Sequence, residues 1–174
     1  MLVLPLNDRH DRTGFDCGDA ELNGWFAQVA KQHKEKGISS TFVAVADEAG
    51  MEVFGFYVIS LAELVNTNLP VQYRKRLPTK QPVFRLGRLA TAKSHERKGI
   101  GEYMFFDAID RLTHIAKDVG GIGLVANAKP SAVSFYNRYG FEQMADHPRD
   151  LFLPLQRPSR ATTLAASLRP HSQR

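Results

Sequence analysis

The chain contains 174 residues but only one cysteine, Cys17, and no long hydrophobic run. A single cysteine excludes an intramolecular disulfide and is typical of proteins from a reducing compartment. The N-terminal residues show no basic segment followed by an apolar one, so we expect no signal peptide. The longest apolar stretch, near residues 53–62, is far shorter than the roughly 20 residues of a membrane-spanning helix. These absences predict a soluble cytoplasmic protein that does not enter a membrane.

Metal-binding and nucleophilic patterns are absent as well. The six histidines are not spaced in the ligand pairs that a zinc site requires. Cys17 lies between Asp16 and Asp19, whose negative charges disfavour a reactive thiolate. No serine stands in the strand-turn-helix context that exposes a nucleophile. We therefore expect no metal site and no cysteine or serine nucleophile.

Acidic residues are scarce in two segments, although the chain as a whole carries a formal charge of only +5. Residues 73–98 contain nine Lys or Arg and a single Glu, and residues 151–174 contain four Arg and no acid. Such a concentration of positive charge is typical of a protein that binds a polyanion. A solvated basic loop and a basic tail would produce the same pattern.

The length and the hydrophobic pattern predict one domain at 1–155, followed by a basic tail at 156–174 without regular structure. The strand expected at 83–92 and the helix expected at 99–119 begin a strand-helix-strand unit, which predicts two parallel strands. Antiparallel strands should flank this pair, so the fold class is α/β with a mixed sheet. The other expected elements are helices at 19–36 and 130–139 and strands at 2–6, 40–47, 53–64, 122–128, 141–144 and 150–155.

The most informative segment joins the central strand to the long helix. It ends in Gly99-Ile100-Gly101, so main-chain N–H groups and the positive end of the helix point at whatever lies above the turn. A dinucleotide site would have a third glycine where Met104 stands, and Gly101-Glu102-Tyr103 lacks the Lys-Ser/Thr pair of a Walker loop. The pattern predicts a pyrophosphate site, and a purely structural glycine turn is the alternative.

This turn and the run 127–141 resemble the acyl-CoA site of the GNAT family of N-acetyltransferases. The family pattern is Gln/Arg-x-x-Gly-x-Gly/Ala; the chain matches both glycines but has Glu96 in the first position, where an anion opposes a pyrophosphate. The resemblance implies a GNAT-like mixed sheet, with central parallel strands flanked by helices, and acetyl-CoA as cofactor. The residues that it assigns to the cofactor are Leu89, Ala90, Thr91, Arg97, Lys98, Gly99, Ile100, Gly101, Glu102, Asn127 and Phe135.

Tyr136 is the catalytic residue that the resemblance implies, although an aromatic at this helical spacing can also be a core residue, as can Phe135. When an amine displaces CoA a thiolate leaves, and a phenol at hydrogen-bond distance stabilises that charge as it forms. The sequence offers no evident general base. This suits an α-amino acceptor, whose pKa of about 7.7–8.0 leaves a useful neutral fraction, better than a lysine with a pKa of about 10.4.

The segments 15–22, 85–90 and 126–141 resemble more narrowly the acetyltransferase toxins of bacterial toxin–antitoxin pairs, over about residues 1–155. The resemblance implies acetylation of the α-amino group of aminoacyl-tRNA, which blocks translation. It also implies a ribbon-helix-helix antitoxin as partner and a homodimer. The basic residues that we expect to contact the nucleic acid by charge are Arg74, Lys75, Arg76, Lys80, Arg88 and Lys93.

Two other functions stay open. An acetyltransferase for a small amine, such as a polyamine, an antibiotic or a free amino acid, would share the cofactor site, but its cationic substrate would prefer an acidic cleft. A non-catalytic module that binds CoA or nucleic acid would keep the fold, and the departure at Glu96 keeps this alternative open. An acetyl-transfer assay distinguishes the three functions. Transfer to charged tRNA supports the toxin, transfer to amine metabolites supports the small-amine acetyltransferase, and binding without turnover supports the non-catalytic module.

Overall fold

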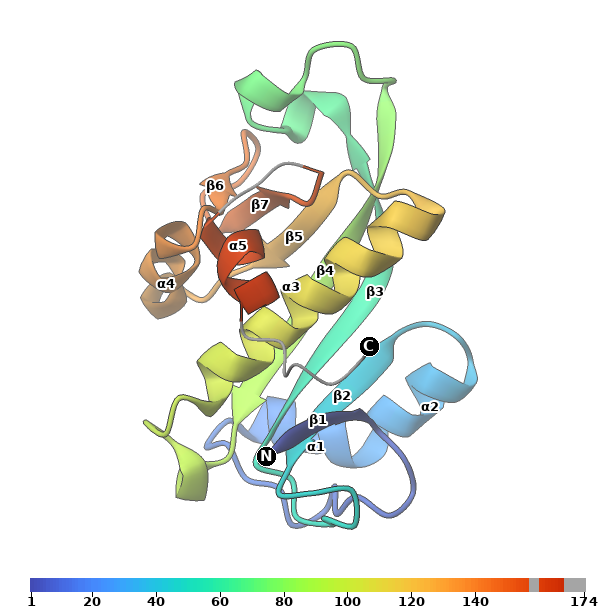
Figure 1. The fold of residues 1–174 in the computed structure, drawn as a ribbon, viewed down its shortest axis with the longest axis vertical. Coiled ribbons are helices and arrows are strands. Elements are labelled where there is room, and N and C mark those ends of the chain that lie inside the picture. Colours follow the sequence, from blue (N-terminus) through green and yellow to red (C-terminus); the bar gives the residue numbers. More distant parts are fainter. Residues whose placement is uncertain (157–159, 168–174) are drawn as a thin grey trace. The chain divides into compact units, whose positions relative to one another are not determined.

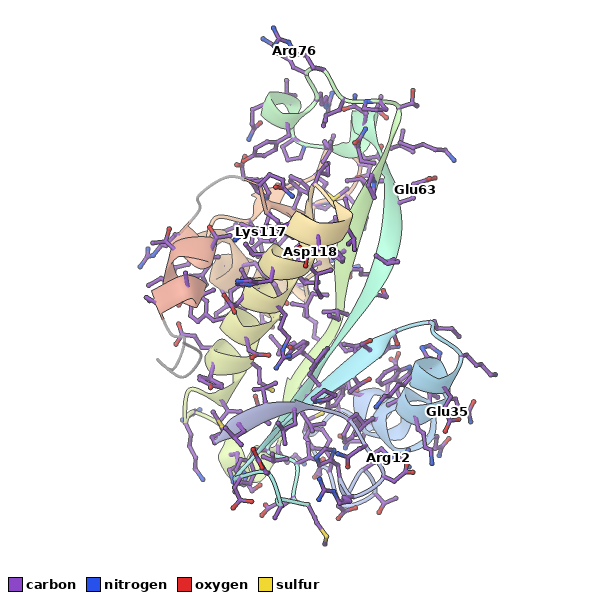
Figure 2. All side chains as sticks on the ribbon, turned by 45° about the vertical axis from the view of Figure 1, so that its right-hand side comes forward. Arg12, Glu35, Glu63, Arg76, Lys117 and Asp118 are labelled. Atoms are coloured by element: carbon purple, nitrogen blue, oxygen red, sulfur yellow. The ribbon has the colours of Figure 1, made fainter. Side chains whose placement is uncertain are left out.

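The computed structural model describes residues 1–156 and 160–167 (Figure 1). Its strands form one sheet in the order β1-β2-β3-β4-β5-β7-β6. Residue contacts divide the chain into two compact units. Unit 1 comprises residues 1–60 and 87–107, and unit 2 comprises 61–86 and the chain from 108 onward. Figure 2 shows the side chains on the same ribbon.

Unit 1 contains an antiparallel ladder with two helices between its strands. Its elements are β1 (Leu2–Pro5), α1 (Ala20–Gln28), α2 (Ala30–Glu35), β2 (Ser40–Val45), the first part of β3 (Gly55–Val65), the last part of β4 (Lys80–Thr91) and the beginning of α3 (Ile100–Val119). Strands β1 and β2 pair antiparallel from Leu2↔Val45, and β2 and β3 from Ser40↔Ile59. These elements confirm the strands and the long helix predicted from the sequence.

The helix predicted at 19–36 is two helices, so that prediction is wrong about its continuity. Asp19 caps the start of α1, since its side chain accepts hydrogen bonds from the N–H groups of Glu21 and Leu22. Val29 ends α1 and precedes α2, with φ of −109°. The periodicity could not reveal this break, because the apolar stripe continues through Ala30, which is fully buried.

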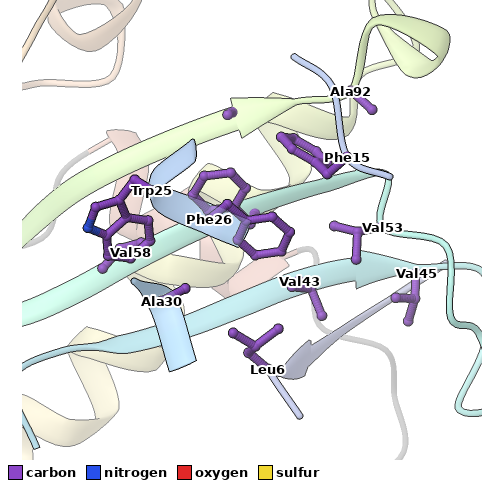
Figure 3. Close-up of a cluster of buried hydrophobic side chains, with 12 residues drawn as sticks. Leu6, Phe15, Trp25, Phe26, Ala30, Val43, Val45, Val53, Val58 and Ala92 are labelled. Carbon is purple, nitrogen blue, oxygen red and sulfur yellow. The ribbon is translucent and has the colours of Figure 1, made fainter. Parts of the chain in front are cut away.

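Aromatic side chains fill the core of unit 1 (Figure 3). The rings of Phe26 and Phe56 stack with centroids 4.3 Å apart, and Phe15 meets Phe26 edge-on at 5.1 Å and Phe56 at 5.2 Å. Aromatic pairs of this kind stabilise by about 0.5–1.5 kcal/mol beyond their buried area. Phe26 of α1 is thereby held against Phe56 of β3.

Unit 2 contains the parallel pair that the strand-helix-strand order predicts. Strand β4 pairs parallel with β5 (Gly123–Asn127) over Phe84–Leu86 and Leu124–Ala126. Strand β7 (Asp150–Pro154) pairs antiparallel with β5 and with the short β6 (Glu142–Gln143). A 3₁₀ turn over Pro130–Ala132 leads into α4 (Val133–Arg138). The core of this unit gathers Leu64, Leu69, Val83, Val125, Met144 and Phe152.

The segment expected to lack regular structure contains a helix, α5 (Arg160–Ser167), which corrects that expectation for these residues. Ala161 and Ala165, one helical turn apart, are buried, and the N–H of Ala161 donates to the carbonyl oxygen of Tyr139. The small apolar face that packs here is too short to give a clear periodic signal. The rest of the predicted tail lies outside the described residues except Gln156, and the domain boundary at 155 stays a prediction. Among the described helices none is long and apolar enough to span a membrane.

Candidate active site

The turn before α3, in unit 1, has an unusual backbone. Arg97 and Gly99 have φ of +58° and +77°, on either side of Lys98. A positive φ is uncommon for a residue other than glycine. Turns that place such residues next to ordinary ones direct successive N–H groups to one side and form concave anion-binding sites. The turn therefore already has a backbone suited to an anion.

Contacts within unit 1 brace this turn. Lys98 Nζ donates to the carbonyl oxygen of Ser94 at 3.0 Å, and Lys93 Nζ forms an ion pair with Asp16 Oδ2 at 3.1 Å. The ring of His95 stacks on Phe54 with centroids 4.1 Å apart. Both lysine ammonium groups are thus already engaged with the protein.

Arg97 differs from these two lysines. It is exposed, and no contact of its side chain occurs among the residues that the structure describes. Arg97 is therefore the side chain of the turn that is free to approach an anion. Glu96, next to it, is also exposed and contributes the opposite charge.

The two glycines of the turn have different requirements. A Cβ on Gly99 would meet nothing within 4 Å, so it is the positive φ that favours glycine there. A Cβ on Gly101 would lie 3.2 Å from Thr91 Oγ1, so glycine allows the start of α3 to approach the end of β4. Ile100 is buried between them, and Glu102 is exposed in the first turn of α3.

The cofactor residues predicted on β4 lie at its C-terminal end. The parallel ladder with β5 ends at Leu86↔Ala126, whereas β4 itself continues to Thr91. Leu89, Ala90 and Thr91 all lie beyond the ladder. An extended strand of this kind can bind an extended ligand through its main-chain groups.

Tyr136, in unit 2, is buried in an aromatic cluster on α4. Its ring is perpendicular to those of Phe141, at 5.1 Å, and Phe135, at 5.7 Å. Phe135 also packs edge-on against Tyr139 at 5.2 Å, so it has the structural role of a core aromatic whether or not it touches a cofactor. Burial raises the pKa of Tyr136 to about 12. The phenol is therefore protonated at neutral pH and suited to donate a hydrogen bond, not to act as a base.

Asn127 is the last residue of β5 and faces Asp150 across the ladder with β7. Its side-chain amide donates a hydrogen bond to Asp150 Oδ1. The sequence predicts a cofactor contact for Asn127 and gives no signal for Asp150. Nothing near Asp150 in the sequence marks it, because its pairing with Asn127 depends on the register of two strands.

The basic segment 66–79 is an ordered loop in unit 2. The side-chain amide of Asn66 donates to the carbonyl oxygens of Arg74, at 3.2 Å, and Leu77, at 3.3 Å. Arg74 Nε donates to the carbonyl oxygen of Leu69 at 2.8 Å. Arg74 therefore helps to hold the loop in shape, which the basic pattern did not predict.

Lys75 and Arg76 are the exposed cations of this loop. Arg76, with φ of +63°, projects from the loop into solvent in Figure 2. Neither side chain has a contact among the described residues. These two are the cations of the loop that a polyanion can reach.

Three other residues predicted to contact nucleic acid have partners within the protein. Lys80 Nζ pairs with Glu63 at 2.8 Å, and Lys93 pairs with Asp16. The guanidinium carbon of Arg88 lies 4.1 Å from the centre of the Trp25 ring, and burial lowers the pKa of Arg88. Each of these three cations therefore already has a partner within the protein. No group of three His, Cys, Asp or Glu able to hold a metal occurs in residues 1–156 and 160–167.

Comparisons with known proteins agree on one family. Residues 16–150 match the family model "Acetyltransferase (GNAT) domain". A tRNA-acetylating toxin of Mycobacterium tuberculosis is 29% identical over 149 residues, which cover 85% of this chain and 88% of that protein. The crystal structure of a tyrosine-to-phenylalanine mutant of KacT matches with a TM-score of 0.82 and 28% identity, over 89% of this chain and 95% of that one. The structure of AtaTR bound with acetyl-CoA matches with a TM-score of 0.75 and 26% identity, over 89% and 94%.

Proposed function

This chain belongs to the acetyltransferase (GNAT) family, and we propose that it is a toxin that transfers the acetyl group of acetyl-CoA to the α-amino group of aminoacyl-tRNA. The assignment of aminoacyl-tRNA as the acceptor rests on the similarity, along 85% of the chain, to a tRNA-acetylating toxin. The exposed pair Lys75 and Arg76, on a loop held by Asn66, supports it, because exposed cations can neutralise the phosphates of a nucleic acid. Acetylation of the α-amino group blocks its use in peptide synthesis.

The residues of the turn fit the diphosphate of acetyl-CoA. The N–H groups from Arg97 to Gly101 would hold it, with Arg97 as the free cation. The main-chain groups of Leu89, Ala90 and Thr91 would hold the extended pantetheine arm. Bound acetyl-CoA supplies the acetyl group as a reactive thioester.

Tyr136 would then act at the thioester sulfur. With acetyl-CoA bound, attack of the amine nitrogen on the carbonyl carbon would break the C–S bond, and a hydrogen bond from the phenol would stabilise the charge that the sulfur gains. A thiol has a pKa near 8.5, well below the value of about 12 for Tyr136. The phenol therefore keeps its proton, and the proton that the amine loses reaches the thiolate through solvent. The products are the amide and free CoA.

The biological context follows the same resemblance. We propose that the protein acts in the cytoplasm as a homodimer and is neutralised by a small ribbon-helix-helix antitoxin. Co-expression with the product of an adjacent small reading frame should restore growth and yield a complex that co-purifies. Growth arrest that no such partner relieves would argue against the antitoxin.

The decisive experiment uses acetyl-CoA labelled in the acetyl group. Wild-type protein is incubated with aminoacylated tRNA, with the same tRNA after deacylation, and with polyamines, and the Tyr136→Phe variant is the control. Label should enter only the aminoacylated tRNA. Label in the polyamines would favour a small-amine acetyltransferase, and CoA binding without any transfer would favour a non-catalytic module.

A further inference from the structure

Unit 2 contains a cavity of about 220 Å³ that shares only Asn127 with the residues predicted to bind the cofactor. Its apolar wall includes Val83, Val125 and Met144, which belong to the core of the unit. Its polar wall includes Arg85 on β4, Asn127 at the end of β5 and Asp150 on β7. Polar groups supply most of the cavity surface, and polar groups that converge on a pocket fix the orientation of a small ligand.

The charge of this cavity is opposite to that of the chain. Three carboxylates, from Glu63, Asp146 and Asp150, and one guanidinium, from Arg85, line it, so these groups sum to −2 in a chain of +5. Glu63 is paired with Lys80. Asp146 and Asp150 are held only by neutral amides, those of Asn68 and Asn127. Within the described part of the chain no cation neutralises either aspartate.

Arg85 has no ion pair either among the described residues, although it shares the cavity with these carboxylates. The register explains why: Arg85 lies opposite Val125, whereas Asp150 lies opposite Asn127 on the other side of β5. Two strand spacings, about 10 Å, separate the backbones of β4 and β7. The cavity thus presents hydrogen-bond donors on one side and negative acceptors on the other.

We propose that this cavity binds the α-aminoacyl group of the acceptor, an inference that rests on the proposed function for the source of that group. The ammonium lies against Asp146 and Asp150, the adjacent carbonyl oxygen accepts from Arg85, and the side chain contacts Val83, Val125 and Met144. Free amino acids share this chemistry, with a carboxylate in place of the ester carbonyl. An acidic side chain is excluded, because it would bring a third negative charge beside the two aspartates.

The basic loop and the negative cavity bind different parts of the acceptor. The cations of the loop bind the phosphates, and the carboxylates bind the amine, so each charge of the acceptor meets its opposite. The carboxylates also raise the pKa of the bound amine, which makes the reaction depend on pH in a way that substitution of an aspartate should change.

The test compares steady-state kinetics of the wild type with Asp150→Asn, Asp146→Asn and Arg85→Gln. Asp118→Asn, which removes an exposed carboxylate of α3 (Figure 2), is the matched control. The acceptors are tRNAs charged with neutral, basic and acidic amino acids, and the corresponding free amino acids. We expect the aspartate variants to raise KM for the acceptor by about 10- to 100-fold, as loss of a charged hydrogen bond does, and to shift the pH–rate profile toward lower pH. CoA affinity and melting temperature should stay unchanged in Asp146→Asn, because Asp146 accepts from Asn68 and not from a residue predicted to bind the cofactor.

The outcomes separate this proposal from the proposed function. Unchanged acceptor KM in both aspartate variants, or equal rates with acidic and neutral aminoacyl groups, would overturn the cavity assignment. Transfer to free amino acids alone, still weakened by Asp150→Asn, would support the cavity and reject the tRNA. If no acceptor reacts, calorimetry with a 3′-aminoacylamido-adenosine decides: binding that Asp150→Asn weakens supports the cavity, and no binding to the wild type rejects it.

Discussion

The guanidinium of Arg88 on β4 lies 4.1 Å from the centre of the Trp25 ring on α1. Trp25 is buried, and Arg88 is half-buried against it. The relationship joins a helix and a strand that are more than 60 positions apart in the sequence. It gives Arg88 a structural role in unit 1, in addition to the nucleic-acid contact predicted for it.

Arg88→Ala should therefore destabilise the protein. A partly desolvated cation–π contact stabilises by about 1–2 kcal/mol, and the aliphatic part of the side chain adds packing. Chemical denaturation should show a free energy of unfolding lower by about this amount. Lys117→Ala, on an exposed lysine, is the control. A fully stable Arg88→Ala variant with weakened tRNA binding would show that Arg88 contacts the tRNA and does not stabilise the fold.

The double variant Lys75→Gln, Arg76→Gln should weaken tRNA binding without a change in melting temperature. Each phosphate contact adds about 0.7–0.9 to the slope of log affinity against log salt, so the slope should fall by about 1–2. Lys80→Gln is the informative comparison, because Lys80 is already paired with Glu63. A salt dependence that stays the same would place the tRNA elsewhere.

Tyr136→Phe should lower kcat by about 10²- to 10³-fold, the usual effect of losing one hydrogen-bond donor to charge that develops in the transition state. The ring keeps its packing against Phe135 and Phe141, so CoA affinity and melting temperature should be preserved. Kinetics and calorimetry on the same preparation check both statements. Unaltered turnover would mean that another group stabilises the thiolate.

The pH dependence should be governed by the amine at neutral pH. Activity should rise with a midpoint at or above about 7.7–8.0, the pKa of a free α-amine, as the neutral form accumulates. Burial raises the pKa of Tyr136 to about 12, so the phenol stays protonated and adds no fall in rate until the pH approaches that value. A descending limb near pH 10, the ordinary pKa of tyrosine, would contradict this.

Glu96→Gln should tighten CoA binding by about two- to fivefold. Glu96 is exposed beside Arg97 in the turn, and solvent screening keeps the effect of one exposed charge below about 1 kcal/mol. Isothermal titration with CoA measures it, with Glu48→Gln, an exposed carboxylate outside the turn, as control. Equal affinities of the Glu96 variant and the wild type would mean that the diphosphate does not approach this side of the turn.

The local features of the fold were predictable from the sequence. The cap at Asp19, the glycine turn before α3 and the parallel pair β4–β5 each follow from turn chemistry or hydrophobic period over a few residues. The break at Val29 and helix α5 were not predictable in this way. Both depend on how short segments pack, which the period of an apolar stripe does not record.

The sequence by itself therefore determined the family, and it predicts the glycine turn as an anion site and Tyr136 as the catalytic residue. Tertiary structure alone decided which charges are free. Lys80, Arg88 and Lys93 are engaged by Glu63, Trp25 and Asp16, whereas Lys75 and Arg76 remain exposed. Asp150 lies beside Asn127 because of the register between β5 and β7. The physical reason is that charge and periodicity are properties of a segment, whereas an ion pair or a cavity wall exists only after distant segments have come together.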